Sequence, residues 1–270
     1  MKTLLASIAI GVGFAQVQAG DFLVHTFTKK QLSTEFWSEG AAFGDFNGDG
    51  ENDIVSGPYW WEGPGFEKRH AYAAATQSFK RKTDSGSEET ARGYDPLGYS
   101  RNFLAYTGDF NGDGATDILI LGFPGEESSW YENPGQKGEG HWKRHIVLEV
   151  TDNESPTFTD ITGDGKPEVV CSSKGAYGFA EPDPKNPTGL WKWTAITPNN
   201  NYHKFTHGMG VGDVNGDGRP DLLEKDGWWE QPAEKGVLWK QHKYAFSRGG
   251  DEHGGSQMFA YDFDGDGDND

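Results

Sequence analysis

Five acidic nine-residue segments repeat along the 270-residue chain, and they constrain its fold more than any other feature. They read DFNGDGEND at 45–53, DFNGDGATD at 109–117, DITGDGKPE at 160–168, DVNGDGRPD at 213–221 and DFDGDGDND at 262–270. Successive segments start 64, 51, 53 and 49 residues apart. A period near 50 residues is typical of repeat architectures built from one supersecondary unit.

The sequence between the acidic loops is also repeated, and it has the pattern of short strands. The runs that follow the first four loops are DIVSG, DILILG, EVVCSS and DLLEK. Aromatic runs come next at 59–62, 130–132 and 228–230, and Gly/Pro turns follow them. Each repeat ends in EKRHAY, WKRHIV, WKWTAI or WKQHKY, with Thr194 in place of the histidine in the third. The pattern predicts about four strands per repeat, and therefore an all-β fold of the β-propeller type.

The number of repeats predicts how many blades of the propeller this sequence contains. The sequence holds four blades and the opening of a fifth, and it stops at the ninth position of the fifth loop. We therefore expect the chain to be truncated, within a full propeller of about seven or eight blades. Leu23–Phe27, which includes His25, resembles the last strand of a repeat. Residues 76–94 lengthen the first repeat and are interpreted as an inserted surface loop.

Charge and cysteine content exclude several classes of protein. The 24 Lys+Arg against 42 Asp+Glu give a net charge of −18, which argues against binding to nucleic acid or to anionic lipid. The 39 Gly and 13 Pro argue against a helical bundle. The single cysteine, Cys171, excludes an intrachain disulfide and is interpreted as a buried, inert thiol. Something other than disulfides must then stabilise the fold.

The N-terminus has the pattern of an export signal. Lys2 precedes an apolar run from Leu4 to Ala15, and Val17-Gln18-Ala19 has the small-residue spacing of a cleavage site. We predict a signal peptide over 1–19, cleaved after Ala19, and a mature chain over 20–270 that is secreted or periplasmic. No later stretch reaches the about 18 apolar residues of a membrane span, so no transmembrane segment is predicted.

The acidic loops have the donor pattern that calcium prefers. Ca²⁺ takes about 6–8 oxygen ligands, and positions 1, 3, 5 and 9 of each loop offer side-chain oxygens while position 7 offers a carbonyl. The predicted ligands are Asp45, Asn47, Asp49, Glu51 and Asp53; Asp109, Asn111, Asp113, Ala115 and Asp117; Asp160, Thr162, Asp164, Lys166 and Glu168; Asp213, Asn215, Asp217, Arg219 and Asp221; and Asp262, Asp264, Asp266, Asp268 and Asp270. The third loop departs from the pattern at Thr162 and Glu168. Five structural ions would change the net charge from −18 to −8.

Two other loop types share part of this sequence pattern. An EF-hand needs flanking helices and a glutamate at position 12, which only the fourth loop has, as Glu224. The loops also have the sequence of acidic Asx turns that bind no metal. That reading leaves several carboxylates close together with no cation, which is unfavourable.

These loops and their neighbours resemble the FG-GAP/VCBS repeats of secreted bacterial proteins, whose blades are similar to those of the integrin α-subunit propeller. Phe43-Gly44, Gly57-Pro58 and Gly122-Phe123-Pro124 match the Phe-Gly and Gly-Ala-Pro elements of that family. The third and fourth repeats lack the Gly-x-Pro element, so the resemblance over about residues 30–270 rests there on the acidic loop. It implies a calcium-binding propeller. It does not define an activity, because the family includes adhesion proteins, ligand-binding modules and carbohydrate-active enzymes.

The segments just before the loops differ most between repeats. In a propeller the first strand of each blade lines the central channel, so variable polar residues there are candidates for a site at the channel mouth. The candidates are Glu39, Arg101, Asn102, Asn153, Glu154, His203, His207 and His253. Such a ring has the chemistry to bind an anionic or polyol ligand or to perform acid–base catalysis, and it is equally compatible with a solvated rim.

The recurrent aromatic and histidine positions are interpreted as scaffold. His25, His70, His145 and His242 occupy one equivalent position in successive repeats. In Trp60-Trp61 and Trp228-Trp229 the two side chains should lie on opposite faces of a strand, so an exposed member would be able to stack on a sugar.

The sequence therefore predicts a secreted, calcium-stabilised propeller that serves as a binding or interaction module for an extracellular carbohydrate or protein. The alternative is a lyase or hydrolase of polysaccharides with its site at the channel mouth. No catalytic residue is assigned.

Overall fold

The computed structural model describes residues 26–75, 78–92, 102–135, 140–246, 255 and 257–270. The chain divides into two parts, Met1–Gln31 and Leu32–Asp270. The described residues of the first part, 26–31, form no strand. The predicted signal peptide, His25, Arg101 and His253 lie outside the described residues.

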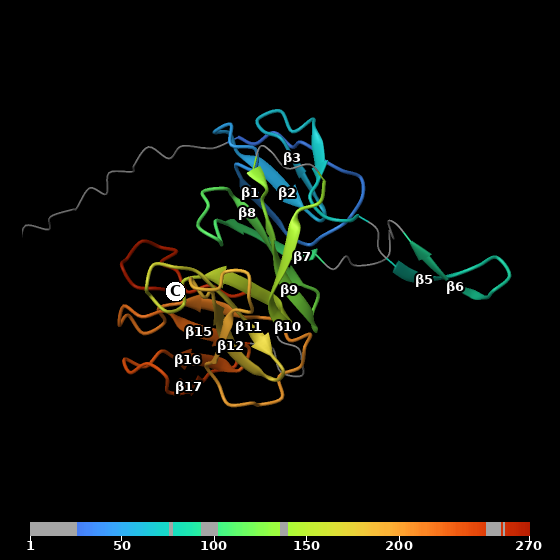
Figure 1. Ribbon diagram of the computed structural model, residues 1–270. Coiled ribbons are helices and arrows are strands. Elements are labelled where there is room, and N and C mark those ends of the chain that lie inside the picture. The colour runs from blue at the N-terminus through green and yellow to red at the C-terminus, as the bar shows by residue number, and fades with distance from the viewer. Residues whose placement is uncertain (1–25, 76–77, 93–101, 136–139, 247–254, 256) are drawn as a thin grey trace, which may run out of the picture. The chain divides into compact units, whose positions relative to one another are not determined.

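All regular structure in the described ranges is β, which confirms the all-β prediction (Figure 1). No helix long or apolar enough to cross a membrane occurs there. The strands are β1 (Ala41–Gly44), β2 (Asp53–Ser56), β3 (Tyr59–Trp61), β4 (Arg69–Ala71), β5 (Ser78–Lys82), β6 (Glu88–Arg92), β7 (Asn102–Gly108), β8 (Asp117–Gly122), β9 (Glu126–Glu132), β10 (Lys143–Thr159), β11 (Glu168–Ser173), β12 (Ala176–Glu181), β13 (Lys192–Ala195), β14 (Gly210–Gly212), β15 (Asp221–Glu224), β16 (Gly227–Glu230) and β17 (Lys240–Lys243).

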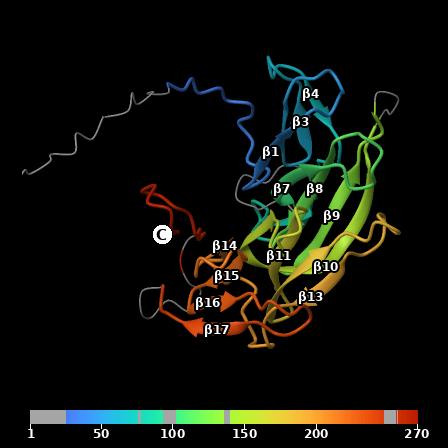
Figure 2. The ribbon, with the colours of Figure 1, turned by 90° about the vertical axis from the view of Figure 1, so that its left-hand side faces the viewer.

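Antiparallel pairing follows the chain order within each sequence repeat. The sheets are β1-β2-β3-β4, the seven-stranded β7-β8-β9-β10-β11-β12-β13, and β14-β15-β16-β17, which Figure 2 shows side by side in that order. A separate hairpin, β5-β6, lies within residues 76–94. In each of the first four repeats the acidic loop connects the first strand to the second.

Strand β10 joins the second repeat to the third. We expected WKRHIV and TDNESPTFTD to form separate strands, but both lie in this single 17-residue strand. Its first half pairs with β9, its second half pairs with β11, and the register shifts between Asp152 and Thr157. It therefore serves as the last strand of one repeat and the first of the next, which is why seven strands replace two sets of four.

The first strands of successive repeats lie beside one another. Thr107 Oγ1 of β7 donates to the Phe43 carbonyl of β1 at 2.8 Å. The Tyr106 hydroxyl of β7 donates to the Pro156 carbonyl of β10 at 3.4 Å. β10 in turn lies against β14. The ends of β1, β7 and β10 that precede the acidic loops are therefore brought to neighbouring positions.

The hydrophobic core lies between repeats, because the second strands β8, β11 and β15 are buried on both faces. In β8, Ile118 and Ile120 pack in one cluster with Val55 and Trp60 of the first repeat. The alternate residues Leu119 and Leu121 pack in another cluster with residues of the third repeat, including Cys171. A third cluster joins the third and fourth repeats. This is the alternation that a strand covered on both sides requires. Cys171 is fully buried and unpaired, as predicted.

Candidate functional site

The five acidic loops share one conformation, which is set by the carboxylate at position 1. In the second loop, Asp109 accepts the backbone N–H groups of Gly112, Asp113 and Gly114 at 2.7, 3.1 and 2.9 Å. The two glycines have φ of 79° and 86°, a region that L side chains rarely adopt. The equivalent acceptors in the other loops are Asp45, Asp160, Asp213 and Asp262.

Positions 3, 5 and 7 continue this pattern. In the second loop, Asn111 Oδ1 accepts the N–H of Asp113 at 3.0 Å, and Asp113 accepts the N–H of Ala115 at 2.9 Å. The position-5 carboxylates of the other loops likewise accept the N–H at position 7, in the pairs Asp49–Glu51, Asp164–Lys166, Asp217–Arg219 and Asp266–Asp268. Asn47, Asn215 and Asp264 repeat the role of Asn111. Each loop thus folds around its own oxygen atoms.

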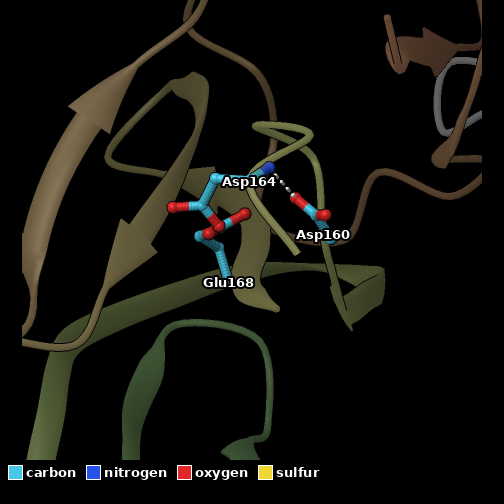
Figure 3. A group of neighbouring side chains, drawn as sticks. All are labelled: Asp160, Asp164 and Glu168. Carbon is cyan, nitrogen blue, oxygen red and sulfur yellow. Dashed lines mark hydrogen bonds between the residues drawn. The ribbon is translucent and has the colours of Figure 1, made fainter. Parts of the chain in front are cut away.

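Carboxylate oxygens converge most closely in the third and fifth loops. Ligand atoms of Asp160, Asp164 and Glu168 all lie within 4.8 Å of one another, and Figure 3 shows the Asp164 and Glu168 carboxylates pointing toward each other. Asp262, Asp264 and Asp270 form the same kind of group. Like the third loop, the other three loops carry acids at positions 1, 5 and 9 and no acid at position 3.

The acidic residue at position 9 is buried in the first four loops, and in the first, second and fourth loops it joins three segments of its repeat. Asp117 accepts the N–H of Phe110 at 3.0 Å with one oxygen and the N–H of Asn133, just after β9, at 2.8 Å with the other. Asp53 and Asp221 make the same two bonds. Burial raises the pKa of Asp117 to about 7, although these N–H donors oppose the shift. Burial also raises the pKa of Asp53 and of Asp221.

The third loop has a glutamate, Glu168, at position 9 in place of the aspartate of the other loops. Pro182 follows β12 where Asn133 follows β9, and proline has no N–H to donate. Position 9 there is Glu168, whose longer side chain accepts the N–H groups of Ile161 at 3.1 Å and of Thr162 at 3.4 Å. Burial raises the pKa of Glu168 to about 7. The two departures from the repeat pattern therefore compensate each other.

Sequence reasoning missed the side chains that connect one acidic loop to the next repeat. Asn133 Nδ2 donates to the Phe46 carbonyl in the first loop and to the Thr116 carbonyl in the second, both at 2.9 Å. Gln231 Nε2 donates to the Ile161 carbonyl at 2.5 Å, which joins the fourth repeat to the third loop. The only signal was an amide residue following the aromatic-aromatic-Glu run in two repeats.

The structure brings four of the predicted channel-mouth residues together. Asn153 and Glu154 lie at the register shift of β10, and their N–H groups donate to the carbonyls of Lys204 and Thr206 at 2.7 and 2.9 Å. His207 Nε2 lies 3.2 Å from Glu154 Oε2. His203 belongs to the same connection between β13 and β14.

Two further channel-mouth residues lie on earlier repeats. Asn102 begins β7 and donates to the Tyr72 hydroxyl at 3.3 Å. Glu39 is exposed and precedes β1.

The recurrent histidines form a repeated cross-strand contact. The His70, His145 and His242 rings stack on Trp60, Trp130 and Trp228 with centroids 4.1, 4.5 and 4.1 Å apart. Their Nε2 atoms lie 2.7, 2.8 and 2.6 Å from carboxylates of Glu62, Glu132 and Glu230. Trp60 and Trp61 are 7% and 4% exposed, which agrees with their interpretation as scaffold, and neither is available to stack on a sugar because the strand is covered on both faces.

Comparison with known proteins supports the repeat assignment. The family model of the FG-GAP-like repeat matches residues 109–171, from the second acidic loop into β11. This match agrees with the resemblance drawn from the sequence. A search of curated proteins found no match.

Two solved structures are similar to the chain. One is an Agrocybe aegerita lectin described as recognising non-reducing terminal N-acetylglucosamine, with a TM-score of 0.40, 19% identity and coverage of 74% of this chain and 50% of the lectin. The other is the V. cholerae biofilm matrix protein Bap1, with a TM-score of 0.35, 16% identity and coverage of 73% of this chain and 29% of Bap1. The chain therefore spans half the length of the lectin and less than a third of Bap1.

Proposed function

We propose that the chain is a secreted, calcium-stabilised β-propeller that binds an extracellular ligand, a carbohydrate or a protein. Each four-stranded repeat is one blade, and export depends on a signal peptide cleaved after Ala19. The calcium ions have a structural role.

The observation that carries the calcium proposal is the common conformation of the five loops. Their donors are carboxylate and amide oxygens, the hard ligands that Ca²⁺ prefers, and in the third and fifth loops three such groups lie within 4.8 Å. The position-9 carboxylate of the first four loops is buried near the exposed acids of the same loop, so a bound cation would offset the repulsion. The residues present therefore fit calcium.

Two features support the propeller. The four-stranded antiparallel repeats follow one another in chain order, and their first strands lie beside one another. Their cores lie between consecutive repeats rather than inside each one. A radial arrangement of blades has these properties.

The test is a thermal melt of the full chain in calcium and in EGTA, with metal content measured by elemental analysis. A site held at 100 times its Kd contributes about 2.7 kcal/mol to stability, so occupied loops should raise Tm by many degrees. Magnesium at the same concentration is the control. An unchanged Tm together with no bound metal would overturn the calcium proposal.

A second candidate function is polysaccharide cleavage. It is favoured by the His207–Glu154 pair, whose side chains are 40% and 30% exposed and therefore accessible to a substrate. A carboxylate beside an imidazole is suited to acid–base chemistry. Assays for new reducing ends with the parent chain and with His207→Ala test this candidate, and equal product from both would reject this pair as its site.

A further inference from the structure

A cavity of about 800 Å³ adjoins the channel-mouth residues and includes one of them, His203, in its lining. Three segments line it: the connection from β13 to β14, the turn between β15 and β16, and the end of β17 with the residues that follow. Its size is within the range of about 300–1,000 Å³ that is typical of small-molecule sites. None of the predicted calcium ligands lines it.

The cavity wall carries a positive charge that no ion pair satisfies within the described part of the chain. Gln241 and Lys243 lie two residues apart on β17 and both line the cavity, while His242 between them stacks on Trp228. Lys243 is exposed and has no acidic partner among the residues that the structure describes. Lys225 also lines the cavity, but it pairs with Asp226 at 2.7 Å. One unpaired ammonium group in a chain of net charge −18 is suited to a single negative charge.

The remaining wall is suited to hydroxyl groups and to the face of a ring. Gln241 Nε2 donates to Glu224 at 3.2 Å, so its amide oxygen is available to accept a hydrogen bond. Asn200 donates to the Tyr202 hydroxyl at 3.3 Å and likewise keeps an acceptor oxygen. Tyr244 lines the cavity and is 65% exposed, so its aromatic ring offers an apolar surface to a ligand.

We propose that this cavity binds a sugar residue that carries a carboxylate, a uronic acid, with Lys243 pairing with the carboxylate, the amides bonding to hydroxyls and Tyr244 stacking on the ring. The inference rests on the proposed ligand-binding function and names its ligand class. A neutral sugar would leave Lys243 without its partner.

The test is calorimetric titration of the full chain in calcium with digalacturonate, dimannuronate and a glucuronate-containing disaccharide. We expect at least one to bind, and its methyl ester to bind at least about tenfold more weakly, because esterification removes a charge-assisted hydrogen bond. Lys243→Gln should weaken binding of the acid by a similar factor and leave binding of the ester unchanged. Tyr244→Ala should weaken both.

Lys240→Gln is the matched control, because Lys240 lies on the opposite face of β17 beside Glu230 at 3.6 Å. It should leave affinity unchanged. Three results would overturn the proposal: no uronate binds, the ester binds as well as the acid, or Lys243→Gln has no effect. Calcium stabilisation without uronate binding would reject only this cavity, whereas uronate binding without calcium stabilisation would reject only the calcium-stabilised scaffold.

Discussion

Asn133 offers the sharpest test of how the repeats are held together. This residue is 4% exposed, and its side-chain N–H groups donate to carbonyls in two different acidic loops. Its side-chain oxygen also accepts the N–H of Gly135 at 2.9 Å. Asn133→Ala removes all three bonds and leaves their backbone partners without this side chain.

The expected cost follows from these contacts. A buried neutral hydrogen bond contributes about 0.5–1.5 kcal/mol net, and an orphaned buried partner costs about 1–3 kcal/mol. Asn133→Ala should therefore lower the free energy of unfolding by about 2–4 kcal/mol. Asn133→Asp is isosteric and keeps the acceptor for Gly135, but its carboxylate faces two carbonyl oxygens. It should cost more than the alanine variant.

Urea unfolding followed by tryptophan fluorescence, at one fixed calcium concentration, measures both variants. With a slope of about 3 kcal/mol per molar urea, the alanine variant should unfold about 1 M earlier. Asn186→Ala is the control, because Asn186 is exposed in a turn and should change stability by less than about 0.5 kcal/mol. An alanine variant within that range, or an aspartate variant as stable as the alanine variant, would refute the reasoning.

Three further predictions concern other contacts. Asp109→Ala should remove the calcium-dependent stabilisation of one loop, about 2.7 kcal/mol at 100 times Kd. The control variant Glu67→Ala changes an exposed residue outside the loops and should keep that stabilisation. Tm measured against calcium concentration in both variants tests this prediction. His145→Ala should lower the free energy of unfolding by about 1–3 kcal/mol, because the imidazole is 6% exposed and lies between Trp130 and Glu132. A loss of less than about 0.5 kcal/mol in urea unfolding would contradict this prediction. Burial raises the pKa of Glu224, although the backbone N–H of Asp226 opposes the shift more than the Asp226 carboxylate adds to it, so the folded state keeps that proton to higher pH than the unfolded state does. Stability from this group is therefore lost as pH rises through the folded pKa, and Glu224→Gln should gain stability over the parent at pH 8 but not at pH 4; an equal difference at both pH values would be inconsistent with it.

The repeated antiparallel strands could be predicted from the sequence. A strand pattern that recurs with each acidic loop predicts antiparallel repeats, and β8 and β11 are found where DILILG and EVVCSS predict them. The boundary between repeats was not accessible. β10 runs through it, because Lys143–Thr159 finds one partner strand in β9 and another in β11. Strand pairing between repeats is a tertiary property that a local pattern does not encode.

The candidate cavity was inaccessible for a related reason. Lys243, Asn200 and Asp226 come from three segments that the fold brings together, and they share no motif. The burial of both members of the Trp60-Trp61 pair was likewise not specified by the sequence. Alternation on a strand predicts which residues share a face, but it does not show that the next repeat covers the outer face.

The third repeat shows why departures from the pattern are informative. Pro182 removes the N–H that a position-9 aspartate accepts in the other complete repeats, and Glu168 reaches instead to Thr162 within its own loop. In the same repeat Phe179 and Thr194 replace the stacked tryptophan and histidine at paired positions. In each case two residues that contact one another, or would do so in another repeat, are replaced together. Lys243, a cavity residue on β17, has no such partner: it alternates with the scaffold residue His242, yet no acid in the described chain balances it. Lys243 therefore takes no part in the contacts that hold the repeat together, although its neighbour His242 does. Its ammonium group is available to bind a ligand. The variant pair Lys243→Gln and Lys240→Gln therefore separates ligand binding from scaffold stability on a single strand.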